Sequence, residues 1–307
     1  MRASFRVAHE WPLAVALVLA LAPLSAQAPT PAAPPPGTDI HLLPLDDGLN
    51  GLSTATPVPV ATTRGYENQP AFDDDGQVVL FTAMRDGIQT DGYAYDRRTR
   101  ATRALWTTPE GEYSPTPTPD GTGYSVIRVE ADGTQRLWRF PRDGGAPSLV
   151  LTDIKPVGYH AWVGEDVLGL FVLGQPATLQ IARVSTGRAE IEATGIGRSL
   201  HRVPGTRAVS FVQRVSDEEH WIAEIDVDTR ATIRLVRTVD GSSDRDYAWM
   251  PDGQTVLMSA GTRIHRWTRG DAGWTEVFDG APHTLGAITR LAVSPKADAI
   301  AIVVNER

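Results

Sequence analysis

The chain has 307 residues, of which 41% are hydrophobic, and this length fits one large all-β domain with a sizeable core. The formal net charge is −8 and no run rich in lysine or arginine occurs, which argues against a nucleic-acid partner. Because there is no cysteine, disulfides, thiolate nucleophiles, cysteine-based zinc sites and a cysteine-linked lipid anchor are excluded.

The first 28 residues have the layout of a secretory signal. Arg2 and Arg6 give a positive start, residues 12–24 are almost wholly Ala, Leu and Val, and small residues follow. The alternative is an uncleaved membrane anchor, but the apolar run is shorter than the roughly 20 residues that a bilayer requires. We predict a signal peptide over residues 1–28, cleaved after Ala26 or Ala28, and export to the periplasm or out of the cell.

A proline-rich segment follows the predicted signal. Residues 29–38 are dominated by proline and small residues, a composition typical of a stiff and extended linker. We therefore predict that the folded domain occupies residues 39–307.

A turn phrase, clearest as Pro-Asp-Gly, recurs through the rest of the chain. Proline fixes φ, aspartate bonds its own backbone and glycine tolerates positive φ, which suits a tight turn. Good copies end at Gly76, Gly121 and Gly253, and the copies near residues 165, 205 and 297 are weaker. Successive copies are 45, 44, 40, 48 and 44 residues apart.

Each repeat contains four short candidate strands. A strand with a nearby aromatic residue enters the turn, an apolar strand leaves it, and two further strands complete the unit. The apolar strands are predicted at residues 78–81, 124–129, 167–172, 208–212, 255–258 and 299–304. Four strands in about 40–45 residues are typical of one propeller blade.

The last repeat ends after its second strand, and its missing strands are found near the start of the domain. Residues 39–45 match a third strand and residues 57–63 match a fourth. We predict an all-β, six-bladed β-propeller with four antiparallel strands per blade, in which the N-terminal strands close the last blade and so hide its open edges.

The repeats and the export signal resemble the WD-like propellers of TolB-like periplasmic proteins. That resemblance implies a propeller that offers its central mouth to a protein or a peptide. The α/β domain that precedes the propeller in TolB has no counterpart in this sequence. The repeats also resemble the propellers of prolyl-oligopeptidase-type enzymes, but the G-x-S-x-G motif of their hydrolase domain does not occur.

Polar residues that precede the aromatic column are the candidate partner-binding site, because the first strands of all blades line one channel. The set is Glu67, Gln69, Glu112, Tyr159, His160, Arg198, His201, Arg245, Asp246 and Arg290. Blades one and two supply acids that would hold an amine, and blades four to six supply three arginines that would grip a carboxylate. The alternative is that these groups only bind channel waters and one another, with about 0–1 kcal/mol per exposed pair.

Two other functions fit the fold. The first is a metal-dependent lyase or hydrolase acting on an acidic saccharide, because the set includes histidines and carboxylates. His160 and His201 are single and 41 residues apart, which does not favour a metal centre. The second is a scaffold that uses its outer strands. We predict a monomeric binding protein rather than an enzyme, with no catalytic residue, metal or cofactor and no membrane span after signal cleavage.

Overall fold

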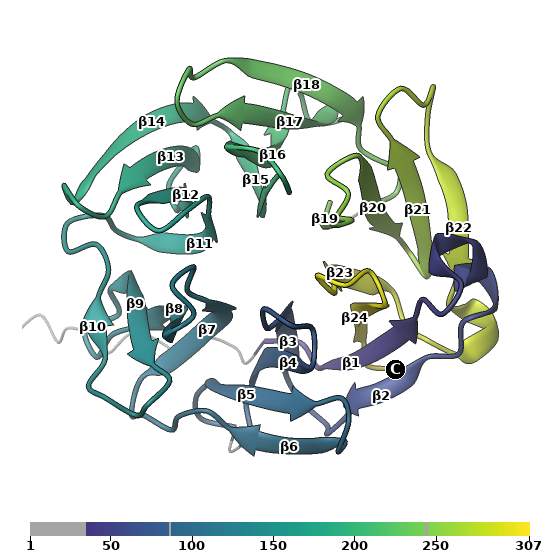
Figure 1. Ribbon diagram of the computed structural model, residues 1–307, viewed down its shortest axis with the longest axis horizontal. Helices are drawn as coiled ribbons and strands as arrows, with labels where there is room; N and C mark the ends of the chain where they lie inside the picture. Colours follow the sequence, from purple (N-terminus) through teal and green to yellow (C-terminus); the bar gives the residue numbers. More distant parts are fainter. Residues whose placement is uncertain (1–34, 86, 243–244) are drawn as a thin grey trace, which may run out of the picture. The chain divides into compact units, whose positions relative to one another are not determined.

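Six four-stranded antiparallel sheets surround a common axis in the computed structural model, which describes residues 35–85, 87–242 and 245–307 (Figure 1). The prediction of a six-bladed β-propeller is thereby confirmed. The predicted signal peptide and residues 29–34 of the predicted linker lie outside the described residues and stay predictions.

The first three blades follow the chain from residue 67 to residue 194. Blade one contains β3 (Glu67–Phe72), β4 (Val78–Ala83), β5 (Asp91–Asp96) and β6 (Ala101–Ala104). Blade two contains β7 (Gly111–Pro117), β8 (Gly123–Val129), β9 (Gln135–Pro141) and β10 (Ser148–Leu149). Blade three contains β11 (Val157–Trp162), β12 (Val167–Val172), β13 (Thr178–Arg183) and β14 (Arg188–Thr194).

Blades four and five continue in the same order, and blade six combines both ends of the domain. Blade four contains β15 (Ile196–Arg202), β16 (Ala208–Arg214), β17 (His220–Asp226) and β18 (Thr232–Arg237). Blade five contains β19 (Tyr247–Trp249), β20 (Thr255–Ala260), β21 (Arg263–Thr268) and β22 (Thr275–Asp279). Blade six contains β23 (Ile288–Val293), β24 (Ala299–Asn305), β1 (Thr38–Pro44) and β2 (Val58–Ala61).

Blade six is closed by the pairing of β1 with β24. The antiparallel register runs from Thr38 opposite Asn305 to Pro44 opposite Ala299, and β2 pairs with the other edge of β1. This confirms the predicted closure by N-terminal strands. A strand that completes a sheet from the far end of the sequence removes an open edge and joins the first blade to the last.

The hydrophobic core lies between neighbouring blades rather than inside any one of them. All six residues of β12, the second strand of blade three, are buried, because both faces of this strand are covered by adjacent sheets. One apolar cluster joins Phe171 and Leu179 of blade three to Phe211 and Ile225 of blade four. A single blade could not bury these side chains, so the ring is the unit that folds.

The predicted Asp–Gly turns are present where the first and second strands meet. Gly76, Gly121 and Gly253 have φ values of +72°, +67° and +64°, which favour glycine. Asp120 and Asp252 accept hydrogen bonds from backbone N–H groups two residues later, at 3.0 and 2.8 Å. The sequence therefore identified both the position and the chemistry of these turns.

Among the residues that the structure describes, helical structure is confined to two short 3-10 segments, η1 (Gly48–Thr54) and η2 (Ala281–His283). Within the described ranges, no helix has the length and apolarity needed to cross a bilayer.

Candidate functional site

The inner strands β3, β7, β11, β15, β19 and β23 face the axis of the ring (Figure 1). Every blade repeats the same strand order, so these strands all begin at one end of the channel and all lead to an Asp–Gly turn or its variant at the other. We call the first end the mouth and the second the turn end. The residues predicted as a binding set lie on or just before the inner strands, and all but His201, the penultimate residue of β15, lie before or in the first two thirds of their strands.

Arg290 brings together residues of four blades. From β23 of blade six, its Nε donates to Asn68 Oδ1 of blade one at 3.1 Å, and its Nη2 lies 3.4 Å from the Tyr159 hydroxyl of blade three. The guanidinium carbon lies 5.3 Å from the Tyr159 ring centroid. Its Nη1 lies 3.8 Å from Asp246 Oδ1 of blade five. The predicted convergence of Tyr159, Asp246 and Arg290 is thus present in the structure.

The charge of Arg290 is stabilised by these neighbours. Burial alone would lower the pKa of Arg290, but the Asp246 carboxylate, followed by Tyr159 and Tyr66, outweighs burial and raises it. The group therefore stays positive at any physiological pH. It presents a fixed cation whose side chain is 13% exposed.

Tyrosines from blades one and two lie close to the residues around Arg290, which we call the axial group: Asn68, Tyr159, Asp246 and Arg290. Tyr66 and Tyr113 make an edge contact with ring centroids 6.4 Å apart. Burial raises the pKa of Tyr66, and the positive charges of Arg290 and Arg198 partly oppose that shift. Tyr66, Asn68 and Tyr113 were not in the predicted set. β3 and β7 each have a register shift that changes which residues face the axis, and a fixed count from the turn does not include that shift.

Several predicted residues link neighbouring blades near the mouth. Gln69 Oε1 accepts from the backbone N–H of Ser114 at 2.8 Å, which joins blades one and two. Asp246 Oδ2 accepts from the backbone N–H of Leu291 at 2.8 Å, which joins blades five and six. Gln69 and Asp246 therefore hold the ring together whether or not they also contact a partner.

Three residues at the mouth have left-handed backbone conformations. Gln69, Ser114 and Arg245 have φ values of +56°, +55° and +50°. Such values are uncommon for residues other than glycine, cost of the order of 1–3 kcal/mol, and gather at functional sites. The strain aims side chains in directions that a regular strand would not allow.

Arg198, Arg245 and His201 are placed around this group in different ways. Arg198 lies close enough to act on the pKa of Tyr66, as Arg290 does. Arg245 instead helps burial to lower the pKa of His220 in blade four. The His201 ring contacts Tyr247 at 4.7 Å, and its Nε2 lies 3.0 Å from Ser199 Oγ. A joint grip by all three arginines stays a prediction.

His160 belongs to a buried junction between blades two and three. Its Nε2 lies 2.7 Å from Ser125 Oγ, which also accepts from Trp162 Nε1 at 2.9 Å. Burial lowers the pKa of His160 to about 4, so the ring is neutral at pH 7. This geometry accounts for His160 by packing and hydrogen bonding.

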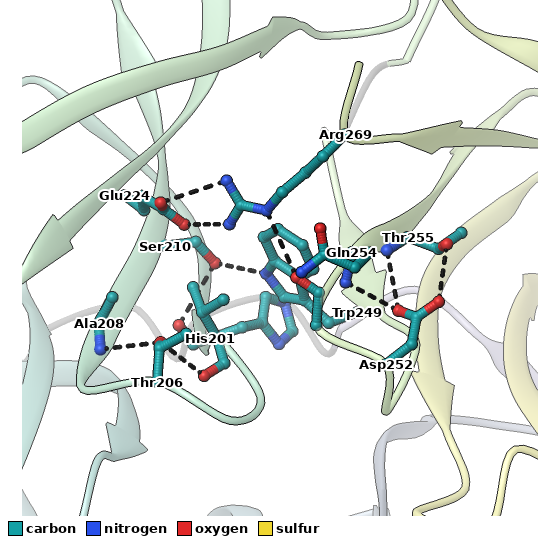
Figure 2. Close-up of polar contacts among 12 residues, drawn as sticks. His201, Thr206, Ala208, Ser210, Glu224, Trp249, Asp252, Gln254, Thr255 and Arg269 are labelled. Atoms are coloured by element: carbon teal, nitrogen blue, oxygen red, sulfur yellow. Dashed lines mark hydrogen bonds and ion pairs between the residues drawn. The ribbon is translucent and has the colours of Figure 1, made fainter. Parts of the chain in front are cut away.

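A matching hydrogen bond from tryptophan to serine occurs between blades four and five. Ser210 Oγ accepts from Trp249 Nε1 and from the Tyr247 hydroxyl, both at 2.8 Å. Figure 2 shows Trp249 beneath Arg269, whose guanidinium spans to Glu224 of blade four with contacts of 2.5 and 3.3 Å. The repeated serine–tryptophan contact is a structural feature of the ring.

Glu67 and Glu112 are both buried near the mouth. Glu67 is the first residue of β3, and Glu112 is the second residue of β7. Glu67 Oε1 lies 2.9 Å from Arg85 Nη2, and Glu112 Oε1 lies 3.2 Å from Arg128 Nε. Burial raises the pKa of each carboxyl to about 7, and the neighbouring arginine only partly opposes that shift. Neither acid contacts Arg290 directly in the described structure.

The metal-binding alternative has little geometric basis. His160 bonds to Ser125 of blade two and His201 bonds to Ser199 of its own strand, so the two histidines lie in separate hydrogen-bonded groups. In the described ranges, no three or more His, Asp or Glu side chains are arranged so that they could hold a metal ion.

No protein-family model and no curated protein matches the sequence. Solved structures show that the chain has the propeller fold of TolB proteins. A protein of Agrobacterium tumefaciens assigned as TolB aligns with a TM-score of 0.70 and 17% identity, over 89% of this chain and 99% of that one. TolB of Acinetobacter baumannii aligns with a TM-score of 0.60 and 13% identity, over 88% of this chain and 64% of that one.

Enzymes share this fold as well. An oligogalacturonate lyase of Vibrio parahaemolyticus aligns with a TM-score of 0.51 and 11% identity, over 77% of this chain and 88% of that one. Identities this low establish the shared fold alone. The choice between binding and catalysis has to rest on the side chains at the mouth.

Proposed function

We propose that this chain is an exported, non-catalytic TolB-like propeller that binds a protein or peptide through the mouth of its channel. The observation that carries the proposal is the convergence on Arg290 of Asn68, Tyr159 and Asp246 from three other blades. A largely buried cation over the Tyr159 ring offers both hydrogen-bond donors and flat apolar surface. Arginine and tyrosine are the residue types that most often anchor protein interfaces.

The distribution of charge suggests what the partner presents. Arg198 and Arg290 lie near the tyrosines, and a guanidinium suits a carboxylate because it provides paired donors. An acidic side chain or a C-terminal carboxylate of the partner fits this half of the mouth. Export by the predicted signal would place the interaction in the periplasm or outside the cell.

The test compares binding by two sets of substitutions at opposite ends of the propeller. The bait is residues 29–307, used with cross-linking in envelope extract. One variant carries Arg198→Ala, Arg245→Ala and Arg290→Ala at the mouth. The matched control carries three arginine-to-alanine changes at the turn end: Arg97→Ala, Arg142→Ala and Arg269→Ala.

We expect a partner that the unchanged bait and the turn-end control both capture and that the mouth variant loses. Circular dichroism of all three baits verifies that each is folded. Capture of the same partner by the mouth variant would refute binding at the mouth. Loss by the turn-end control alone would transfer the interaction to the other end of the channel.

A further inference from the structure

Blades one and two carry two copies of one buried acid–threonine–arginine cluster at the mouth. In the first copy, Glu67 Oε2 accepts from the backbone N–H of Thr63 at 3.2 Å, and Oε1 faces Arg85. In the second copy, Glu112 Oε1 accepts from the Thr108 hydroxyl at 2.6 Å and faces Arg128.

The two copies match in position as well as in composition. Each glutamate stands four residues after its threonine, in the sequences Thr63–Glu67 and Thr108–Glu112. Each also lies next to a Thr-Asp pair from the preceding blade. The backbone N–H of Glu67 donates to Thr38 Oγ1 at 3.3 Å, and that of Glu112 donates to the Thr90 carbonyl oxygen at 2.8 Å. The aspartates of these pairs, Asp39 and Asp91, act electrostatically on the glutamates.

Both clusters contain more carboxylates than guanidinium groups. Glu67 is faced by Arg85 from the segment after β4 and by Asp39 from β1. Glu306 from the end of β24 adds charge beside Asp39 and accepts from the backbone N–H of Gly65 at 2.6 Å. When all three acids are ionised, the described residues of this cluster carry three negative charges, and Arg85 faces one of them, Glu67.

The second cluster has the same imbalance. Glu112 is faced by Arg128 from β8, by Glu110 on its own chain segment and by Asp91 from β5. Glu112 is 1% exposed, and its Oε2 is buried with no hydrogen-bond partner among the described residues. An ionised oxygen in that position has no hydrogen-bond donor among the described residues to stabilise it.

These glutamates secure the two chain segments that border the mouth at blades one and two. Residues 62–66 connect β2 to β3 and contain Thr63, and residues 105–110 connect β6 to β7 and contain Thr108. We propose that Glu67 and Glu112 are paired proton-binding groups that hold these segments closed when protonated and loosen them when ionised. This inference concerns the regulation of the proposed binding site and therefore rests on the proposed function.

The direction of the effect follows from linkage. Each glutamate has an ordinary pKa of 4.5 and a pKa of about 7 in the closed structure. The closed form therefore retains a proton between these values while an opened form releases it, so opening becomes easier as pH rises from about 4.5 to about 7. Above pH 7 both forms are ionised and opening no longer depends on these groups.

The experiment is amide hydrogen exchange of residues 35–307 between pH 5 and 8, corrected for the intrinsic exchange rate. In the unchanged protein, we expect the opening constants of segments 62–66 and 105–110 to rise by up to about tenfold per pH unit up to pH 7 and then level off. Glu67→Gln removes the pH dependence of segment 62–66 alone, and Glu112→Gln removes that of segment 105–110 alone. The control Glu165→Gln, an exposed glutamate at the turn end, leaves both unchanged.

A further variant tests the charge balance itself. Asp39→Asn removes one negative charge beside Glu67 and is expected to lower the pH at which segment 62–66 levels off, with no effect on segment 105–110. A flat pH response in the unchanged protein, or the same response in the Glu67→Gln and Glu112→Gln double variant, would overturn the proposal. Because no partner takes part, failure here is separate from failure of the binding experiment.

Discussion

The two ends of the propeller use their side chains in different ways. At the turn end, an arginine directly after the third strand bridges to a carboxylate of a neighbouring blade at three junctions: Arg97 with Asp298, Arg142 with Asp74 and Arg269 with Glu224. At the mouth, matching positions of the six blades hold five residue types: Gln69, Ser114, Tyr159, Ser199, Asp246 and Arg290, with serine in blades two and four.

Repetition at one end and variety at the other correspond to different tasks. A contact that repeats from blade to blade serves the ring, because every junction has the same geometry to satisfy. At the mouth, Gln69 and Asp246 also bind a backbone N–H of the next blade, but the charge and size of the side chain change from blade to blade. Together these side chains form one asymmetric surface on a repeated scaffold. The turn end is thus the place to measure ring stability, and the mouth is the place to look for specificity.

The largest effect is expected at the junction that Figure 2 shows. Trp249 is 6% exposed, and its Nε1 donates to Ser210 Oγ across the boundary of blades four and five. Trp249→Ala leaves a cavity and removes one of the two donors to buried Ser210, and should lower the free energy of unfolding by about 3–5 kcal/mol. Urea denaturation followed by circular dichroism measures this change.

The matched control for that substitution is Trp274→Ala. Trp274 lies near the outer edge of the same blade, is only half-buried, and donates to the Arg237 carbonyl oxygen at 2.7 Å. We expect a loss of about 1–2 kcal/mol, since less apolar surface is removed. Equal losses for the two variants would mean that the inner junctions do not govern the stability of the ring.

A smaller effect is expected from Asp246→Ala at the mouth. Asp246 is 1% exposed, faces Arg290 and accepts from the backbone N–H of Leu291. Its removal leaves a buried cation and a buried donor without this partner, which should cost about 2–4 kcal/mol in thermal or urea unfolding.

The charge and the hydrogen bond of Asp246 are separated by Asp246→Asn, which retains an acceptor for Leu291 and should recover about half of the loss. Asp74→Ala at the turn end removes a carboxylate that is 64% exposed and is expected to change stability by less than about 1 kcal/mol. If Asp74→Ala proved as costly as Asp246→Ala, the contrast between the two ends would be lost.

The pH dependence of stability should differ between the unchanged protein and the Glu67→Gln, Glu112→Gln double variant. Each glutamate has a raised pKa, so it favours the folded state below pH 4.5 and loses that contribution as pH rises to about 7. Between pH 5 and 7.5, the unfolding free energy of the unchanged protein should therefore fall, relative to that of the double variant, by about 1–3 kcal/mol per glutamate.

Comparison with the variant is needed because other groups titrate in the same range. His160 has a pKa lowered to about 4 by burial, so its contribution to stability is lost as pH falls from about 6.5 toward 4, opposite in direction to the glutamates. That contribution cancels when the double variant is subtracted from the unchanged protein. A difference that does not vary with pH would show that neither glutamate is perturbed.

The turns, the blade count and the closing strands could be predicted because they depend on local chemistry. Gly76 and Gly253 supply the positive φ that the tight turn requires, and the continuous apolar run of residues 299–304 indicates a buried strand. The meeting of Arg290 with Asn68 and Tyr159 could not be predicted to the residue. It depends on bulges that rotate the inner strands, such as the register shift between Asn68 and Ala71.

The neighbours of Glu67 and Glu112 could not be predicted from the sequence either. The sequence suggested Glu67 and Glu112 as acids of the rim, but nothing in their spacing indicated Asp39 or Asp91 as neighbours. Those neighbours come from the third strand of the preceding blade, so they become visible only when the ring is assembled.

The smallest expected effect distinguishes two arginines that occupy the same position in the repeat. Arg142 and Arg269 both follow a third strand and both lie over an aromatic ring, at 4.8 Å from Tyr124 and 5.2 Å from Trp249. Their ion pairs differ. Arg269 makes two contacts with Glu224, whose side chain is 15% exposed, whereas Arg142 makes one contact of 3.3 Å with Asp74.

Because the ring contacts are matched, Arg142→Ala and Arg269→Ala isolate the burial of the ion pair. In urea unfolding, we expect Arg142→Ala to cost about 0–0.5 kcal/mol and Arg269→Ala about 1–2 kcal/mol. The cost of Arg142→Ala should disappear in 1 M salt, because salt screens the exposed ion pair. Equal costs would mean that Arg142 and Arg269 contribute equally to the stability of the ring, whatever the burial of their ion pairs. Unequal costs would mean that the arginine at the junction of blades four and five contributes more to that stability than the arginine at the junction of blades one and two.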